Sequence, residues 1–403
     1  MSDADSSAGT GADTGLESVG PHLESVVAGA LADRDVAAFV HVGTARDPGV
    51  RYCQSILERR LRPGEDRDVV AVAFDGDEWL TETTDGTVSH PAETLADRLA
   101  NRGETEPDAE PRTILTPAAI PHDAALYLER AGFDLASTAV LERARATKTA
   151  DERERIAAAQ AAAGVGIRRA AALLADATIA DGRLVADGEA VTPTRLRTAV
   201  DAAIVEAGAF PAGNTVVNPD SGHVPSSLDG ASAGDGTSTG GTTEDQPLAP
   251  GEPIVLETAP RGPAGYHGGL VRTLVVDSDG GKERRAHVAV TQAFRSAAAM
   301  LTAGAESVTS VEADLEAEIR AFGEDGAVET RVSGVGLESR ERPLAGGEDV
   351  EPDHVVRLEA AVRVDEGQWL RIADLLAKGE AGERAAYLPA PSQSLDPTAL
   401  LEE

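Results

Sequence analysis

The chain has 403 residues, of which 41% are hydrophobic, and a formal net charge of −33. The length suggests two domains, and the apolar fraction is that of an ordinary globular protein, which argues against a chain disordered throughout. So negative a chain is also a poor nucleic-acid binder, because such proteins need positive charge facing the phosphates.

The negative charge runs along the whole chain. Asp and Glu total 69 against 36 Lys and Arg, and only three of the basic residues are Lys. Carboxylates hold water and hydrated cations, and molar salt screens their repulsion to within a few ångströms. The composition therefore predicts a halophilic protein. The alternative, an acidic protein with a basic partner, would favour one acidic block over an even spread.

Cys53 is the only cysteine, so no intramolecular disulfide is possible. Apolar residues around it predict a buried core thiol. A catalytic thiol is the weaker interpretation, because the sequence does not indicate a partner His. No run of 18 apolar residues predicts a membrane span. The N-terminus lacks the basic and then apolar pattern of a signal peptide. A cytoplasmic protein without a membrane partner is expected.

The first part of the chain alternates predicted strands and helices. Residues 1–20 are mostly small and polar, which predicts a disordered acidic tail. Apolar runs predict strands over 37–42, 69–74 and 113–115, and helical spacing predicts helices over 93–101 and 123–131. This alternation predicts an α/β domain over residues 21–146.

The second part predicts long helices and a separate sheet. A capping-box pair, Thr149 and Glu152, starts a long helix, and further helices are predicted over 194–206, over 288–301 and from the pair Thr309 and Glu312 to Phe322. Strands are predicted over 254–257, 270–276, 327–332, 355–364 and 369–376. The pattern predicts an α+β domain over 147–390 with a mixed sheet. Residues 230–247, rich in Gly, Ser and Thr, predict a disordered insert, and 391–403 a tail.

Five stretches, in order, resemble the catalytic domain of the Xaa-Pro aminopeptidase/prolidase metallopeptidases, which have the "pita-bread" fold. They are residues 253–276, 305–322, 332–343, 355–359 and 369–374. The first contains the landmarks Gly265-Tyr266 and Arg272-Thr273. Residues 39–43 and 51–52 resemble the smaller creatinase-like N-terminal domain. The resemblance covers residues 20–390. It implies a pita-bread domain after a creatinase-like α/β domain, in a homodimeric member of haloarchaeal type.

The metal positions of that family are mostly altered in this chain. The resemblance implies two Asp, one His and two Glu around two divalent metals that activate a bridging water. The first Asp corresponds to Glu257, and the first Glu is retained as Glu359. The remaining three positions hold Gly269, Ser333 and Ala373. A dinuclear centre is therefore not expected, and any cofactor would be a manganese, cobalt or zinc ion at a partial site.

The substrate-side histidines of the family are also replaced. Their positions correspond to Asp220, with His223 three residues on, and to Arg340. In the family these histidines shape the substrate pocket and assist proton transfer, which Asp220 and Arg340 cannot do in the same way.

Several interpretations of single residues stay open. His267 completes a single-metal site with Glu257 and Glu359 only if a strand already runs at its position. Without a metal, Arg272 and Arg371 are expected to neutralise these carboxylates. Ser333 has no visible His–Asp pair to activate it. Gly334 and Gly336 are expected as turn residues with positive φ.

Three hypotheses for function follow. The first is a non-catalytic homologue that binds a peptide or protein partner in the former cleft. The second is an active Xaa-Pro aminopeptidase or dipeptidase with an altered single-metal site. The third is a metal-free creatinase-like amide hydrolase, which needs a His base where this chain has Ser333.

Overall fold

The computed structural model describes residues 19–53, 68–84, 89–102, 112–219, 246–324, 326–380 and 382–402. The chain forms two compact units, Met1–Ala144 with Thr149–Asp151, and Arg145–Lys148 with Glu152–Glu403. Most of the predicted tail and of the predicted insert lies outside the described residues. The exceptions include Val19 and Gly20, which are buried at the start of a helix. The predicted disordered tail, residues 1–20, therefore extended too far at its C-terminal end.

The first unit contains a five-stranded sheet in the order β3-β2-β1-β4-β5. The strands are β1 (Ala38–Thr44), β2 (Val69–Phe74), β3 (Trp79–Thr83), β4 (Arg112–Pro117) and β5 (Phe133–Thr138). β1, β4 and β5 are parallel, and β2 and β3 extend the sheet in antiparallel fashion. The predicted α/β pattern is confirmed, although β3 and β5 were not predicted.

The helices of this unit are α1 (Val19–Arg34), α2 (Pro48–Cys53), α3 (Pro91–Ala100), α4 (His122–Arg130) and α5 (Val140–Ala146). Leu95 of α3 and Leu128 of α4 pack in one apolar cluster with Ile114 of the sheet. Cys53 is fully buried, as predicted for a core thiol.

The second unit is built on a seven-stranded sheet in the order β13-β15-β16-β11-β10-β9, with β17 pairing with β16. The strands are β9 (Val216–Val217), β10 (Ile254–Thr258), β11 (Leu270–Leu274), β13 (Val328–Gly334), β15 (Val355–Asp365), β16 (Gln368–Ala377) and β17 (Ala386–Tyr387). Every pairing in this sheet is antiparallel, so the expected mixed sheet was wrong in that respect.

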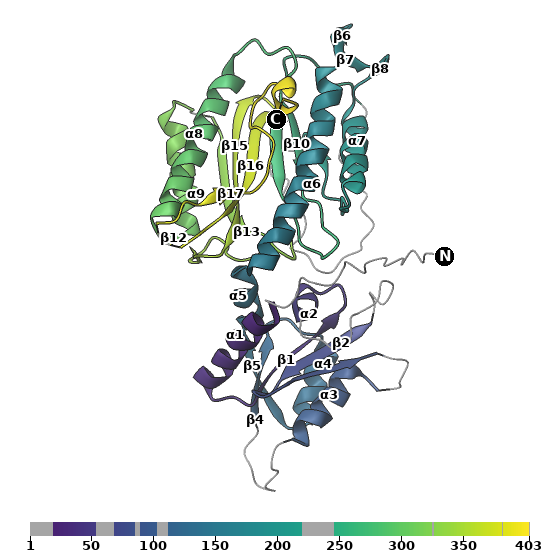
Figure 1. Ribbon diagram of the computed structural model, residues 1–403, viewed down its shortest axis with the longest axis vertical. Helices are drawn as coiled ribbons and strands as arrows, with labels where there is room; N and C mark the ends of the chain where they lie inside the picture. Colours follow the sequence, from purple (N-terminus) through teal and green to yellow (C-terminus); the bar gives the residue numbers. More distant parts are fainter. Residues whose placement is uncertain are drawn as a thin grey trace, which may run out of the picture. The chain divides into compact units, whose positions relative to one another are not determined.

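Four helices pack on this sheet: α6 (Ala150–Ala175), α7 (Pro193–Glu206), α8 (Lys282–Ala303) and α9 (Val308–Ala321). Figure 1 shows α8 and α9 on one side of the strands and α6 and α7 on the other side of the view. Apolar residues of β15 and β16, such as Leu358 and Ile372, pack against α8 and α9. Side chains alternate along a strand, so Arg357 and Glu359 lie on the opposite face, here called the inner face.

Two short sheets and a C-terminal turn complete the second unit. β12 (Glu306–Ser307) pairs with β14 (Asp349–Val350), and β6 (Thr178–Ala180), β7 (Arg183–Ala186) and β8 (Glu189–Ala190) form a small sheet. The segment expected as a C-terminal tail ends in a 3₁₀ helix, η1 (Pro397–Leu400). Leu400 is buried in the apolar cluster beneath α6 and α7. Residues 391–402 therefore pack onto this unit.

Two local expectations were wrong. α9 is capped by Ser307, whose hydroxyl accepts the Ser310 N–H, whereas the predicted capping residue Glu312 accepts the N–H of Val332 at 2.8 Å. Gly334 and Gly336 do not have positive φ. A Cβ at Gly334 would collide with the Arg342 carbonyl, and one at Gly336 with the Glu341 carboxylate. Close approach of neighbouring groups therefore requires glycine at both positions.

In the described ranges, no helix combines the length and apolarity that crossing a membrane requires.

Candidate functional site

The strand register gathers the family positions on the inner face. One row across five strands contains residues whose Cα atoms lie opposite one another: Arg331, Glu359, Ala373, Val271 and Glu257. Directly opposed residues of an antiparallel pair project to the same face. The next row places Ser333, Arg357 and Leu375 side by side. Glu257 and Glu359, far apart in the sequence, therefore face the same space.

Two guanidinium groups bind both of these carboxylates. Arg357 Nη2 lies 2.8 Å from Glu257 Oε1 and 3.3 Å from Glu359 Oε2. Arg371 Nη2 lies 2.6 Å from Glu359 Oε1, and its Nη1 lies 3.9 Å from Glu257 Oε2. Glu257 is only 3% exposed and Glu359 only 6% exposed. Buried carboxylates need such partners, and these four side chains form one buried network.

The charges of this network hold each other ionised. Burial would raise the pKa of Glu359, but Arg357 and Arg371, followed by Arg331, outweigh it and hold that pKa below its ordinary value. Burial would lower the pKa of Arg357, but Glu359 and Glu257 keep it above its ordinary value. Glu359 and Arg357 therefore both stay charged at neutral pH.

The three altered family positions surround Arg357. A Cβ at Gly269 would lie 3.4 Å from Arg357 Cδ, so the arginine stem covers this glycine. Ser333 lies directly opposite Arg357 on the neighbouring strand. Ala373 lies opposite Glu359 and packs in a small apolar cluster with Val255 and Val271. An arginine stem and aliphatic side chains thus occupy this part of the inner face.

His267 does not lie on the strand. β11 begins at Leu270, and the His267 N–H donates to the carbonyl of Gly336 at 2.8 Å. Its Nδ1 lies 3.3 Å from the Ala259 carbonyl oxygen. The condition for His267 to join Glu257 and Glu359 is not met. Over the described ranges, no three His, Cys, Asp or Glu side chains are grouped so that they could hold a metal ion.

Arg272 has a different role from the one expected. It projects from the other face of β11, is 1% exposed, and its Nη2 lies 2.7 Å from Asp374 Oδ1. Its Nε donates to the Ser392 carbonyl at 2.9 Å and its Nη2 to that of Pro391 at 2.6 Å. Arg371 does pair with the inner-face carboxylates, as expected. The second arginine that pairs with these carboxylates is Arg357, where Arg272 had been expected.

Arg340 lies near the network, in the loop after β13, and is half-buried. Burial lowers its pKa, and repulsion from Arg331 lowers it further, while Glu359 opposes this. The charges of Arg331 and Glu359 therefore both act on the Arg340 guanidinium. The two other substrate-side residues predicted by resemblance, Asp220 and His223, fall outside the described residues.

Side chains from α6 and from the segment before it anchor the loops around the site. The Tyr266 hydroxyl donates to Glu152 Oε1 at 3.1 Å, and Gln160 Oε1 accepts the Gly269 N–H at 2.8 Å. Glu341, next to Arg340, is buried and bonded to Lys148 Nζ at 2.6 Å and to Arg145. These buried polar contacts fix the hairpin between β10 and β11 and the loop that carries Arg340.

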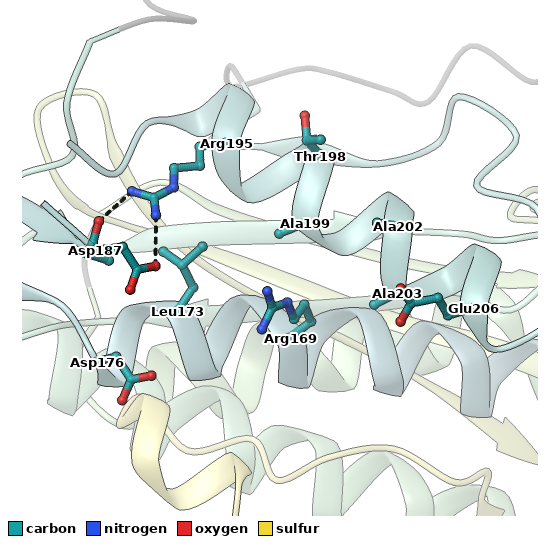
Figure 2. A pocket seen from close by; sticks show the side chains of 11 residues that line it. Arg169, Leu173, Asp176, Asp187, Arg195, Thr198, Ala199, Ala202, Ala203 and Glu206 are labelled. Atoms are coloured by element: carbon teal, nitrogen blue, oxygen red, sulfur yellow. Dashed lines mark hydrogen bonds and ion pairs between the residues drawn. The ribbon is translucent and has the colours of Figure 1, made fainter. Parts of the chain in front are cut away.

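A separate pocket of about 630 Å³ is lined by residues of α6, α7 and the end of β7 (Figure 2). In Figure 2, Arg195 turns toward Asp187, 3.3 Å away, and its Nη1 also donates to the Ala186 carbonyl at 2.9 Å. These bonds fix the small sheet of β6–β8 to α7. The lining contains no inner-face residue, and Arg169 and Arg195 are mixed there with carboxylates. The pocket is therefore distinct from the site.

Solved structures share the fold of the whole chain. A prolidase from Pyrococcus horikoshii OT3 superposes with a TM-score of 0.65 at 15% identity, covering 93% of this chain and 99% of its own. An Xaa-Pro dipeptidase from Bacillus anthracis gives 0.68 at 13% identity, covering 94% and 99%. The N-terminal domain of the FACT complex subunit SPT16 from Cicer arietinum (chickpea) gives 0.64 at 13%, covering 94% and 98%. These likenesses confirm the predicted pita-bread fold after a smaller α/β unit.

The family follows from a second comparison. Residues 154–378, more than half of the chain, match the model of metallopeptidase family M24. The chain therefore belongs to metallopeptidase family M24. A search of the curated proteins found no match.

The sequence alone did not reveal the part played by Arg357. The signal was present, because Arg357 and Glu359 are two residues apart in one predicted strand and so must share a face. That Arg357 extends across the sheet to Glu257 required the register of β15, β16, β11 and β10.

Proposed function

We propose that this M24 member is a non-catalytic homologue that binds a peptide or protein partner at the inner face of its C-terminal sheet. One observation carries the proposal. Arg357 bonds to both Glu257 and Glu359, the only two carboxylates that stand at family metal positions. The guanidinium supplies the positive charge that a metal would supply to these carboxylates.

The residues present do not fit a pair of divalent ions. Two adjacent ions repel, and bridging carboxylates are needed to offset that repulsion. The positions that would bridge hold Gly269 and Ala373, neither of which has a donor atom in its side chain. An ion entering beside Glu257 and Glu359 would also face the guanidinium groups of Arg357 and Arg371.

The fold comparison is compatible with a non-catalytic role. The same scaffold occurs in proteins named as prolidases and dipeptidases and in one named as a subunit of the FACT complex. The scaffold therefore does not by itself imply peptidase activity, and the function must be argued from the site. That chickpea domain supports the idea of a partner-binding member of this fold.

Membership of a metallopeptidase family keeps one alternative in view, an active aminopeptidase or dipeptidase with a single altered metal. It would depend on Glu257 and Glu359 exchanging their arginine partners for an ion, with a third ligand from elsewhere.

The metal-free amide hydrolase requires a base where Ser333 stands, and a serine hydroxyl is too weak a base at neutral pH.

The test is an activity and metal assay on the whole chain, purified in high salt. Xaa-Pro dipeptides are incubated with the protein alone, with manganese and with cobalt, and release of the free amino acids is followed. The proposal predicts no turnover above that of the heat-denatured protein in any of the three. Metal-dependent turnover that is lost in Glu359→Gln would establish the single-metal peptidase. Turnover without metal would establish the amide hydrolase.

A further inference from the structure

Two half-buried arginines of the inner face have no described partner. Arg331 lies on β13 directly opposite Glu359, and Arg340 lies in the loop that follows this strand. Neither guanidinium group makes a hydrogen bond or ion pair with another residue in the ranges that the structure describes. Arg331 nevertheless lies close enough to lower the pKa of Arg340, after burial, by repulsion. Two like charges are thus held together at the edge of the buried network.

The local charge balance is positive. Four guanidinium groups, those of Arg331, Arg340, Arg357 and Arg371, stand against three carboxylates. Two of these, Glu257 and Glu359, are already bonded to Arg357 and Arg371, and the third is Glu312. The nearby Glu312 accepts the backbone N–H of Val332. The excess of guanidinium groups stands out in a chain whose net charge is −33. Holding unneutralised charges out of water costs free energy, so such an arrangement is a candidate for a ligand site.

Some donor atoms at this place lack acceptors. Nε of Arg340 and Nε of Arg357 are buried and, within the described residues, make no hydrogen bond. Arg357 itself is only 7% exposed. The planar guanidinium group donates two parallel hydrogen bonds to the oxygens of a carboxylate or phosphate, and such charged bonds are stronger than neutral ones.

We propose that Arg331, Arg340 and Arg357 form a binding site for an oxyanion, the negatively charged end of the ligand that this protein holds. The carboxylate at the C-terminus of a peptide and a phosphate group share this chemistry. The inference rests on the proposed function, since it assumes that arginines and not metal ions govern the inner face. It adds that the ligand is recognised by its anionic end.

The experiment titrates the whole chain with defined probes at a fixed high concentration of KCl, so that general screening does not change. The probes are N-acetyl-Ala-Pro with a free carboxylate, the same peptide as its C-terminal amide, and inorganic phosphate, and the readouts are binding heat and the melting temperature Tm. We expect saturable binding and a raised Tm with the free acid or with phosphate, and none with the amide. Binding of the acid alone identifies a peptide carboxylate, whereas binding of phosphate alone identifies a phosphate ligand.

Variants separate a site from general attraction. Arg331→Gln and Arg340→Gln should each weaken anion binding about tenfold or more, because a charged hydrogen-bond donor is lost. Each should also keep or raise Tm without ligand, because a repelling charge is removed. Arg320→Gln is the matched control, since Arg320 is an exposed arginine paired with Glu316 on α9. It should leave anion binding unchanged.

Two results would overturn the inference: no saturable binding of either anion, or equal binding by the Arg331→Gln/Arg340→Gln double variant. The peptidase assay on the same preparations is independent of this titration. Turnover would overturn the proposed function, while the titration alone decides whether the anion site exists.

Discussion

The guanidinium of Arg357 lies 2.8 Å from the carboxylate of Glu257, although the two residues are separated by 100 positions in the sequence. They come from β15 and β10, which are separated by β16 and β11 in the sheet. The arginine stem passes over Gly269, where an added Cβ would lie 3.4 Å from Arg357 Cδ. A side chain longer than a methyl group at this position would therefore compete with the Arg357 stem for space.

Replacing Arg357 with methionine should destabilise the protein strongly. The variant keeps most of the side-chain volume but leaves Glu257 and Glu359 buried with Arg371 as their main partner. Removing one partner from a buried ion pair costs about 3–5 kcal/mol of the free energy of unfolding. Denaturant unfolding of wild type and Arg357→Met in the same high salt measures this loss.

A second substitution distinguishes lost pairing from lost packing. The double variant Arg357→Met/Glu257→Gln replaces one of the two carboxylates that lost their partner with a neutral amide. It should therefore be more stable than Arg357→Met alone. Arg320→Met, which removes an exposed arginine on α9, should change stability by less than about 1 kcal/mol. An Arg357→Met variant as stable as Arg320→Met would contradict the buried network.

Restoring the family ligands should not restore a metal site while Arg357 is present. The triple variant Gly269→Asp/Ser333→His/Ala373→Glu places its new side chains around the Arg357 guanidinium, which should pair with the new carboxylates. Adding Arg357→Ala frees the carboxylates for a cation. We expect bound manganese, measured by mass spectrometry after dialysis, in the quadruple variant only.

The control for this series is Arg357→Ala alone, which lacks the restored ligands and should bind no stoichiometric manganese. If the triple variant already held manganese tightly, Arg357 would not be the group that excludes the metal.

Acid should lower the free energy of unfolding, partly through protonation of His354. Burial lowers the pKa of His354 to about 4, and the charge of Lys148 adds to this effect. In the unfolded chain this imidazole has a pKa near 6.5, so it takes up a proton at a higher pH than in the folded protein. Below pH 6.5, protonation therefore stabilises the unfolded state relative to the folded state. The stability that comes from keeping this imidazole neutral is present above pH 6.5 and lost toward pH 4. The loss between pH 7 and pH 5 is about 2 kcal/mol.

Comparison with His354→Asn isolates this histidine from the titrating carboxylates. His354 Nδ1 accepts the Glu351 N–H at 3.1 Å, and an Asn side-chain oxygen can accept the same bond without titrating. The stability of His354→Asn should fall less than that of wild type between pH 7 and pH 5. An identical fall in both proteins would show that His354 does not contribute.

Arg272 should hold the C-terminal segment in place. It bonds to Asp374 and to the carbonyls of Pro391 and Ser392 and is fully buried. Arg272→Met should lower the free energy of unfolding by about 3–5 kcal/mol, because Asp374 loses its charged partner. It should also raise amide hydrogen exchange over residues 391–402. Exchange there at the wild-type rate would show that η1 is held by its apolar contacts alone.

Many of the longer regular elements of this protein could be predicted from local patterns. The strands Val69–Phe74 and Ile254–Thr258 and the helix Pro193–Glu206 are apolar or amphipathic in their own sequence, and they form within a residue or two of the predicted bounds. The cap of α9 was mispredicted because Ser307 and Thr309 are both capping residue types. The choice was decided by the β12–β14 pairing, which fixes Ser307 before the helix.

The site was predictable only in part. The altered residues at family positions, Gly269 and Ala373, were visible in the sequence. The replacement of metal charge by Arg357 was not, because it depends on the register of four strands that pair over long sequence distances. Arg272 was expected to neutralise the inner-face carboxylates, but it follows Val271 in β11 and therefore projects from the other face. One position more or less in β11 moves a side chain to the other side of the sheet.

The most direct test of the central claim, that Arg357 stands where a metal would otherwise neutralise Glu257 and Glu359, is a calorimetric titration of the wild-type chain with manganese in high salt. A Glu257→Gln/Glu359→Gln variant corrects for weak binding to the acidic surface. We predict the same weak, unsaturable heat from both proteins. Tight, stoichiometric manganese binding by the wild type that is lost in the variant would contradict the claim.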